Sequence, residues 1–229
     1  MNRQAKYKNG VLVGRGIEWT HVYGENTGFT WNPIGGCLHE CQWRMPDGSI
    51  ATCYAKETAL KFNSAYPDKF EHHYWRPGKL NEPIKHKTPA GIFLDSMSDL
   101  GGYWIPQEQA VAVLGICKQA DWHTFQLLTK NPKRLVTYDL PSNVWPGFST
   151  PPDFMWGKPL SIQQLAAKIT ADLYAMSRIK ATVKWASVEP LSWNVAPFFE
   201  NCGLNWVVIG AASNGPKKYQ PNPVYVQNL

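Results

Sequence analysis

Three cysteines lie close together in the first quarter of the chain. Cys37, Cys41 and Cys53 form a C-x3-C-x11-C arrangement within the segment GGCLHECQWRMPDGSIATC. Three thiolates from one loop can bind three irons of a cubane [4Fe–4S] cluster and leave the fourth iron open to a substrate or cofactor. An open iron would allow catalysis as well as electron storage. Residues 37–53 are therefore expected to form a cluster-binding loop.

The residues around these cysteines suit a negatively charged group. Two glycines precede Cys37 and let the backbone turn tightly, and a helix expected to begin near Cys53 would direct its first N–H groups toward the cysteines. Between Cys41 and Cys53, the sequence PDG (46–48) is a turn signal, so this insert is expected to be a small hairpin. Such a hairpin would return Cys53 to the side of the other two cysteines.

Two other interpretations of the cysteines stay open. The thiols and His39 could bind a structural zinc ion, although paired C-x2-C knuckles are absent and His39 lies two residues from both Cys37 and Cys41. The thiols could also be small buried groups without a metal, because free cysteine is often buried. Cys117 lies in the apolar run VAVLGIC and is expected in the core.

Composition and charge narrow the class of protein. A chain of 229 residues with 44% hydrophobic and 17% charged residues is typical of a globular protein, and one domain is expected over 1–229, with 1–29 as an N-terminal extension. The net charge of +6 is compatible with a polyanionic partner. No segment resembles a secretory signal or a membrane span, so a cytoplasmic protein without a membrane partner is expected. Disulfides are uncommon in that compartment.

Short apolar runs alternate with helical patterns along the chain. Strands are expected at residues 30–34, 91–96, 124–129, 144–149, 183–188 and 206–211, and helices at 53–65, 106–120, 132–137, 161–178 and 195–200. Ser161 is a suitable N-cap for the longest of these helices. The alternation predicts an α/β fold in which helices cover the outer face of a parallel sheet. A partial (βα)6 TIM-like barrel is favoured, with a flat doubly wound sheet as the alternative.

Polar residues follow five of the six expected strands. These segments are DSMSD (95–99), TKN (129–131), ST (149–150), SVEP (187–190) and ASNG (212–215). Ligands bind at the carboxyl edge of parallel sheets, because the βα loops converge there. The repetition therefore predicts a site at this edge.

The ordered motifs resemble those of a known family. TWNPIGGC, CYAKE, IFLDSMSDL, FQLLTKNPKRL, NVWPGFST, WASVEPL and NWVVIGAASNG are similar to motifs of a phage-associated family of unknown function with a three-Cys motif. That family is regarded as a divergent radical S-adenosylmethionine (SAM) group with some similarity to spore photoproduct lyase. The resemblance covers about residues 30–215. It departs from the family patterns in the eleven residues between Cys41 and Cys53, and in AASN (211–214), where typical members have glycines and a carboxylate.

The resemblance implies a radical-SAM-like barrel and an enzymatic activity. A [4Fe–4S] cluster on Cys37, Cys41 and Cys53 would cleave SAM and generate a 5′-deoxyadenosyl radical. The methionine amino group of SAM would lie at the end of the second strand. The implied cofactor-binding residues are Ser96, Ser98, Asp99, Lys130, Ser149 and Glu189, with Met97 and Ser187 beside them. Each residue, taken alone, is also an ordinary capping or loop residue.

The partners and the substrate are hypotheses. The resemblance implies a phage setting and therefore the cytoplasm of the host cell. Modification or repair of nucleic acid is favoured by this setting, by the basic surface and by aromatic residues near the expected loops. These aromatic residues are Trp31, Trp43, Tyr54, Trp104 and Trp145, of which at least half are expected to be packing residues. The chemistry requires an external electron donor, and an open seam between the first and last strands would suit a protein partner. The alternative from another class is a zinc-binding, non-catalytic nucleic-acid-binding or assembly module.

Overall fold

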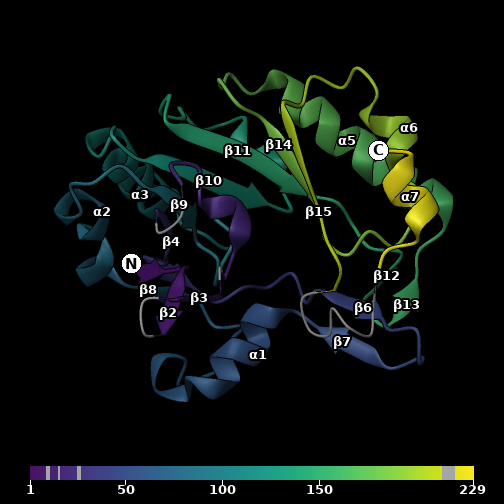
Figure 1. Ribbon diagram of the computed structural model, residues 1–229, viewed down its shortest axis with the longest axis horizontal. Helices are drawn as coiled ribbons and strands as arrows, with labels where there is room; N and C mark the ends of the chain where they lie inside the picture. The colour runs from purple at the N-terminus through teal and green to yellow at the C-terminus, as the bar shows by residue number, and fades with distance from the viewer. Residues whose placement is uncertain (9–10, 15, 25–26, 213–219) are drawn as a thin grey trace.

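A seven-stranded sheet of order β1-β4-β9-β10-β11-β14-β15 forms the centre of the computed structural model (Figure 1). The structure describes residues 1–8, 11–14, 16–24, 27–212 and 220–229. Six of the strands are parallel to their neighbours: β4 (Gly28–Trp31), β9 (Gly91–Leu94), β10 (Thr124–Thr129), β11 (Val144–Ser149), β14 (Trp185–Val188) and β15 (Trp206–Ile209). The short β1 (Asn2–Arg3) pairs antiparallel with β4. All six expected strands are therefore present in one mostly parallel sheet.

The order of the parallel strands follows their order in the sequence. In a doubly wound sheet the order reverses at a switch point, whereas here each new strand adds to the same edge. The flat doubly wound alternative is therefore wrong. An open seam was expected between the first and last parallel strands. The edge of the first strand, β4, is not open, because β1 pairs with it. Within the described residues, no strand pairs with the outer edge of β15.

The strands bury side chains on both faces. Phe125 and Leu127 of β10 are fully buried and belong to one core cluster with helix residues such as Leu165. Because successive side chains of a strand alternate, Gln126 and Leu128 face the other side of the sheet. One face of the sheet therefore packs against helices. The other face is covered by segments outside the sheet, which are described below.

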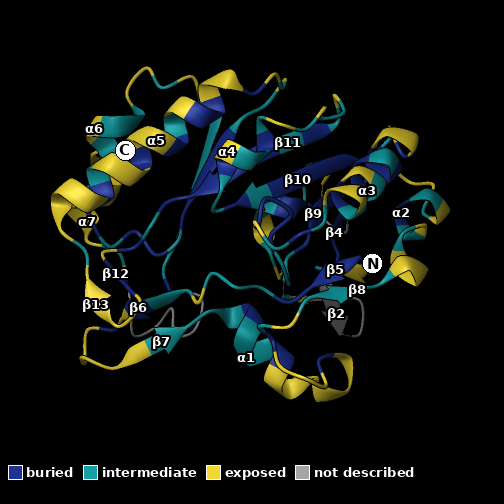
Figure 2. Ribbon diagram, turned by 180° about the vertical axis from the view of Figure 1, so that it is seen from behind, coloured by how far each residue is buried: buried dark blue, intermediate teal, exposed yellow. Residues whose placement is uncertain are grey.

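The four helices expected after residue 100 are present as α3 (Gln107–Gln119), α4 (Pro132–Leu135), α5 (Ile162–Arg178) and α6 (Ala196–Phe199), with α4 and α6 shorter than expected. The helices α2 (Glu82–Lys85) and α7 (Pro223–Gln227) are additional to the expected ones. Helix α5 begins with a capping box, in which Ser161 Oγ accepts from Gln164 N at 3.2 Å and Gln164 Oε1 accepts from Ser161 N at 2.9 Å. Figure 2 shows α5 buried along one stripe and exposed along the other. No helix in the described part of the chain is long and apolar enough to cross a membrane.

Several predicted boundaries are corrected. The strand expected at 30–34 is two strands, β4 and the short β5 (Ile34–Gly35), which pairs with β8 (Tyr74–Trp75) outside the main sheet. Pro33 lies between them and has no N–H group to continue the ladder. The strand expected at 91–96 ends at Leu94, because Asp95 adopts a φ of +55°.

Three further elements are shorter than predicted. The helix expected at 53–65 is α1 (Tyr54–Lys61), followed by a separate 3-10 turn over Asn63–Ala65. The strand expected at 183–188 starts at Trp185, and the one expected at 206–211 ends at Ile209. These differences lie at element ends, where the local pattern of apolar residues continues into the loops.

The N-terminal extension fills the inner face of the sheet. Trp19, in the 3-10 turn Glu18–Thr20, packs against Phe93, Trp185 and Trp206 with ring centroids 4.6, 5.0 and 6.2 Å apart. Its carbonyl oxygen accepts from Gln126 Nε2 at 2.7 Å. This aromatic cluster closes the floor beneath the site described below, a role that the sequence did not predict.

Candidate functional site

The predicted hairpin between Cys41 and Cys53 is present. Strands β6 (Gln42–Arg44) and β7 (Ile50–Thr52) pair antiparallel, and the backbone N–H of Cys53 donates to the carbonyl oxygen of Cys41 at 3.1 Å. Gly48 takes the left-handed backbone conformation in its turn, with φ +82°. The hairpin therefore returns Cys53 to Cys41, as the turn signal predicted, and α1 begins at the next residue.

Gly36 fixes the other end of the cysteine loop. Its φ is +85°, and a Cβ atom there would lie 1.7 Å from the carbonyl oxygen of His72. The N–H of Gly36 donates to the carbonyl oxygen of Met97 at 2.9 Å, and the next N–H, of Cys37, donates to that of Phe70 at 3.0 Å. Only glycine fits this close approach, so the segment that carries Cys37 is tied to the end of β9 and to residues 70–72.

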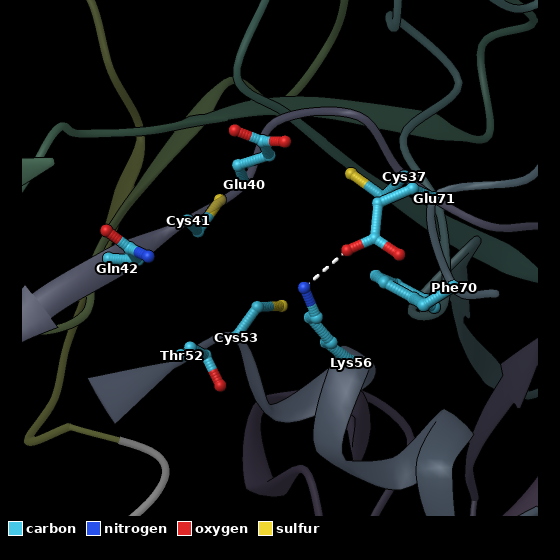
Figure 3. A pocket seen from close by; sticks show the side chains of 9 residues that line it. All are labelled: Cys37, Glu40, Cys41, Gln42, Thr52, Cys53, Lys56, Phe70 and Glu71. Carbon is cyan, nitrogen blue, oxygen red and sulfur yellow. Dashed lines mark hydrogen bonds and ion pairs between the residues drawn. The ribbon is translucent and has the colours of Figure 1, made fainter. Parts of the chain in front are cut away.

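The three cysteines line one cavity of about 200 Å³, the thiol cavity (Figure 3). Its other lining residues are Glu40, Gln42, Thr52, Lys56, Phe70 and Glu71. The ion pair between Lys56 and Glu71 lies beside the thiols. Among the described residues, no three His, Cys, Asp or Glu side chains are grouped to hold a single metal ion. The thiols thus share a space without forming an assembled single-ion site.

Two further cavities adjoin the thiols. The strand-end cavity, of about 100 Å³, is lined by the cysteines and by Ser96, Ser98, Asp99, Lys130 and Ser149. The central cavity, of about 650 Å³, is lined by Cys41, Cys53, Lys130, Ser149, Ser187 and Glu189, with Trp19, Phe93 and Leu128 among its apolar residues. All six residues implied for cofactor binding therefore lie on cavities that the cysteines also line. The carboxyl edge of the sheet forms the common wall.

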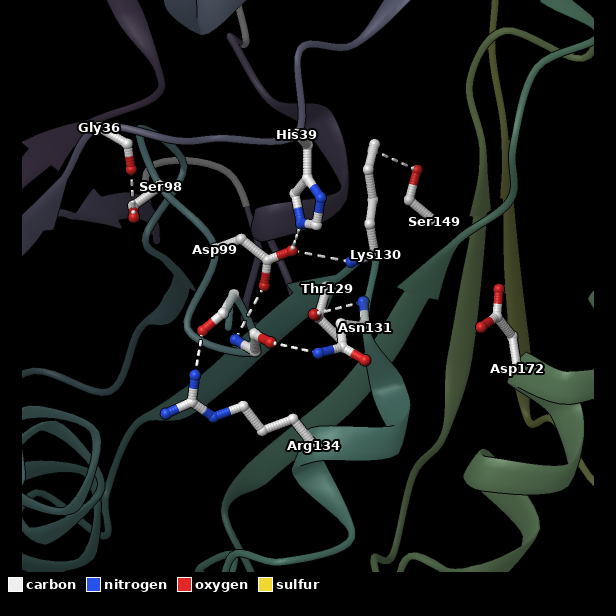
Figure 4. Close-up of polar contacts among 12 residues, drawn as sticks. Gly36, His39, Ser98, Asp99, Thr129, Lys130, Asn131, Arg134, Ser149 and Asp172 are labelled. Atoms are coloured by element: carbon white, nitrogen blue, oxygen red, sulfur yellow. Dashed lines mark hydrogen bonds and ion pairs between the residues drawn. The ribbon is translucent and has the colours of Figure 1, made fainter. Parts of the chain in front are cut away.

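Asp99 joins the cysteine loop to β10. Its Oδ2 lies 2.6 Å from His39 Nε2 and accepts from the N–H of Lys130 at 2.9 Å, while its Oδ1 accepts from the N–H of Gly101 at 2.9 Å (Figure 4). Burial works to raise the pKa of Asp99, but the hydrogen bond and charge of His39 hold it below its ordinary value. The carboxylate is thus charged and fully engaged by the protein.

The two serines of the DSMSD segment hold the residues that lead into the cysteine loop. Ser98 Oγ donates to the carbonyl oxygen of Gly36 at 2.7 Å, and Ser96 Oγ donates to Asn32 Oδ1 at 3.2 Å. Asn32 Oδ1 also accepts from the N–H of Met97 at 2.9 Å. These contacts show a positioning role for both side chains, which the resemblance alone did not indicate.

Lys130 is a cation on two of the cavities that the cysteines line. Its Nζ donates to Ser149 Oγ at 2.8 Å. Burial works to lower the pKa of Lys130, but the nearby Cys41, Cys53 and Asp99 raise it above its ordinary value. Lys130 is therefore charged at neutral pH and lies on both the strand-end and central cavities.

Two of the three thiols have a raised pKa in this environment. Burial, reinforced by the charge of Asp99, raises the pKa of Cys37 well above its ordinary value. Burial also raises the pKa of Cys41, although Lys130 opposes this shift. A metal bound here would have to displace the thiol protons, because thiolates are the ligating form.

Glu189 and Asp95 are two further carboxyl groups on these cavities. Burial raises the pKa of Glu189, although Ser187 Oγ donates to Glu189 Oε2 at 2.8 Å. Asp95 is 2% exposed, burial raises its pKa well above the ordinary value, and its Oδ2 has no hydrogen-bond partner in the structure. Its Oδ1 accepts from the N–H of Ile34 at 3.3 Å. The position of Asp95 after a buried strand was a usable signal, but the sequence did not single it out.

The aromatic residues considered at this edge divide into two groups. Trp43 and Tyr54 line the central cavity, and Trp104 packs edge-on against His39 with centroids 4.9 Å apart. Trp31 is fully buried in the core, and Trp145 lies at the opposite, amino-terminal end of β11, so these two are packing residues. In the last polar segment, Ala212 lines the central cavity, while residues 213–215 lie outside the described residues.

Comparison with known proteins identifies a family. The family model described as "Protein of unknown function (DUF5131)" matches residues 15–229, which include the cysteine loop and every strand-end residue above. Neither the search of curated proteins nor the search of solved structures found a match. The chain belongs to the DUF5131 family of proteins of unknown function.

Proposed function

We propose that this protein is a radical-SAM-like enzyme whose Cys37, Cys41 and Cys53 hold a [4Fe–4S] cluster. The observation that carries the proposal is the shared cavity of these thiols beside the carboxyl edge of a parallel sheet. The carboxyl edge is where α/β folds bind ligands. The unidirectional strand order is consistent with a partial (βα)6 barrel of the radical-SAM type.

The donor set fits an iron–sulfur cluster better than a single ion. In general, three thiolates from one loop can bind three irons of a cluster and leave the fourth iron open. Cys37, Cys41 and Cys53 supply three such thiols on one cavity. A single zinc ion would need a fourth ligand about 2.0–2.3 Å away, and His39, the candidate for it, is engaged with Asp99 at 2.6 Å. A cluster of several irons separates its thiolates more widely. The charged Lys130 beside Cys41 and Cys53 supplies a counter-charge for an anionic group.

The roles of the residues follow from the contacts described. When bound, the cluster would supply one electron to the sulfonium of SAM, and cleavage of a C–S bond would give methionine and a 5′-deoxyadenosyl radical. Ser96 and Ser98 hold the residues that lead into the cysteine loop against the end of β9. Lys130, with its ammonium group on the cavity wall, is suited to bind the carboxylate of methionine.

The apolar part of the central cavity has a separate task. Trp19, Phe93 and Leu128 close it on the side of the sheet. Exclusion of water would protect a radical from side reactions. Glu189 lines the same cavity and accepts a hydrogen bond from Ser187 Oγ at 2.8 Å, so its carboxyl group is held where it can form a hydrogen bond with the bound molecule.

Metal analysis of anaerobically purified protein tests the proposal. Wild type should be brown, absorb broadly near about 400 nm and contain about four irons per chain. Cys53→Ala should lose the iron and the colour. Cys117→Ala is the matched control, because Cys117 is fully buried in the core cluster and should leave the iron content unchanged. Colourless wild type with one zinc would overturn the proposal and support the zinc-binding, non-catalytic alternative.

A second measurement separates SAM chemistry from other iron–sulfur chemistry. Protein reduced with dithionite should convert SAM to 5′-deoxyadenosine and methionine, and Lys130→Met should weaken SAM binding while keeping the iron. Iron-loaded protein that leaves SAM intact would restrict the function to redox chemistry. For the substrate, we favour a nucleic acid that is modified or repaired, because the chain is basic and aromatic residues border the site.

A further inference from the structure

An exposed tryptophan lies at the tip of a hairpin near the thiol cavity. Strands β12 (Phe154–Met155) and β13 (Lys158–Pro159) pair so that Trp156 and Gly157 form the whole turn. Phe154 and Met155 are 3% and 5% exposed, whereas Trp156 is 59% exposed. The hairpin therefore buries its base and presents an indole to the surroundings.

The turn does not favour this residue. Trp156 has φ +51° and Gly157 φ +75°, so both central residues are left-handed, as in a type I′ turn. Asn-Gly or Asp-Gly is the usual choice there, because a bulky residue at positive φ is strained. A large aromatic side chain with a strained backbone and an exposed ring does not stabilise the fold. This combination indicates a role in binding.

The hairpin is held against the loop that carries the cysteines. The N–H of Gly157 donates to Gln42 Oε1 at 2.9 Å, and the guanidinium of Arg44 lies over the ring of Phe154, 4.8 Å from its centroid. Gln42 follows Cys41 and lines the thiol cavity. Both views show β12 and β13 beside β6 and β7 (Figures 1 and 2). The turn that carries the indole is thus held against the hairpin of the cysteine loop, next to the thiol cavity.

The residues around the indole favour a nucleic acid over a protein. Arg44 and Lys158 are exposed cations on the two contacting hairpins. The exposed residues of the turn and of β13 are Trp156, Gly157, Lys158 and Pro159, so the turn and β13 place a cation and no carboxylate beside the indole. Aromatic side chains that stack bases, with cations for the phosphates, are typical of proteins that bind single strands.

We infer that Trp156, Arg44 and Lys158 bind a single-stranded nucleic acid at the rim of the site. One base stacks on the indole, and the two cations contact the flanking phosphates. This inference rests on the proposed function for its purpose, which is to bring a strand to the central cavity. The binding itself requires neither the cluster nor SAM, so it can be tested in metal-free protein.

The test is fluorescence anisotropy of the full chain with labelled single-stranded DNA and RNA oligonucleotides at low salt. Trp156→Ala should weaken binding about tenfold, since stacking on one base contributes about 1–3 kcal/mol. Trp156→Phe should retain most of the affinity. Tyr174→Ala is the matched control, because Tyr174 is 67% exposed on α5, away from the hairpins, and should bind like wild type.

The charge contribution is measured at Lys158, because Arg44 also packs on Phe154. Lys158→Gln should reduce the slope of log affinity against log salt by about 0.7, the value for one phosphate contact on a single strand. Equal affinity of Trp156→Ala and wild type would overturn the inference, as would absence of binding to every strand. The iron content of Trp156→Ala should equal that of wild type, so a failure here is distinguishable from a failure of the proposed function.

Discussion

Replacement of Gly36 by alanine tests how the cysteine loop is fixed. Gly36 and Gly48 have nearly equal backbone angles, with φ +85° and +82°, and both lie in the cysteine segment. They differ in their surroundings, because a Cβ at Gly36 would meet the carbonyl oxygen of His72 at 1.7 Å, whereas a Cβ at Gly48 would meet nothing within 4 Å. The pair therefore separates backbone strain from steric exclusion.

The expected magnitudes follow from these contacts. At either position, alanine at positive φ costs about 1–2 kcal/mol. At Gly36 the backbone must also move, which breaks the hydrogen bonds of its N–H to Met97, of its carbonyl oxygen to Ser98 and of the N–H of Cys37 to Phe70. At about 1 kcal/mol each, these three bonds add about 3 kcal/mol. We expect Gly36→Ala to lose about 4–5 kcal/mol and Gly48→Ala about 1–2 kcal/mol.

Urea denaturation of both variants, followed by tryptophan fluorescence, measures the difference. Anaerobic iron analysis of the same samples shows whether the displaced Cys37 still contributes to metal binding. Equal losses of unfolding free energy in the two variants would refute the reasoning, because steric exclusion at His72 would then have no effect. A large loss for Gly36→Ala with full iron retention would show that the loop reaches its bound position without this anchor.

Three other predictions concern charges. In metal-free protein, Lys130→Met should move alkylation of Cys41 to higher pH, since the ammonium opposes the rise in the pKa of that thiol; an unchanged pH profile by mass spectrometry would contradict this. Asp99→Asn should make the free energy of unfolding less sensitive to acid. A carboxyl group with a lowered pKa stabilises the fold above about pH 4, and this contribution is lost as the pH falls further. Denaturation of both proteins at pH 7 and pH 3 measures the difference. In iron-loaded protein, Glu71→Gln should raise the reduction potential and Lys56→Gln should lower it, since both groups border the thiols and reduction adds negative charge; shifts of the same sign would exclude direct charge effects.

The strand pattern was predictable because parallel strands are buried on both faces. Segments such as TFQLLT (124–129) are apolar enough to be recognised without structural information, and the observed strand has those limits. The cysteine hairpin was predictable for a local reason, the turn signal PDG. Boundaries failed where a single residue has an unusual backbone, as Asp95 does with its φ of +55°.

The contacts within the site were less predictable. His39 and Asp99 are sixty residues apart, and the spacing of the cysteines gives no information about this 2.6 Å contact. Asn32 and Ser98 likewise act through pairings that depend on how the loop lies on the sheet. The family resemblance favoured a ligand-binding role for Ser96 and Ser98, and the sequence could not correct it, because a hydroxyl group that holds a loop has the same sequence signal as one that faces a cavity.

The indole of Trp19 has a consequence for what the central cavity can accept. Because this side chain comes from a turn ahead of the first parallel strand, the depth of the cavity is set by a segment that lies outside the strands of the sheet. Relatives with a smaller residue at this position would have a deeper chamber behind the same cysteine loop. Chain segments outside the sheet can thus change the size of the accepted molecule while the chemistry at the strand ends stays the same.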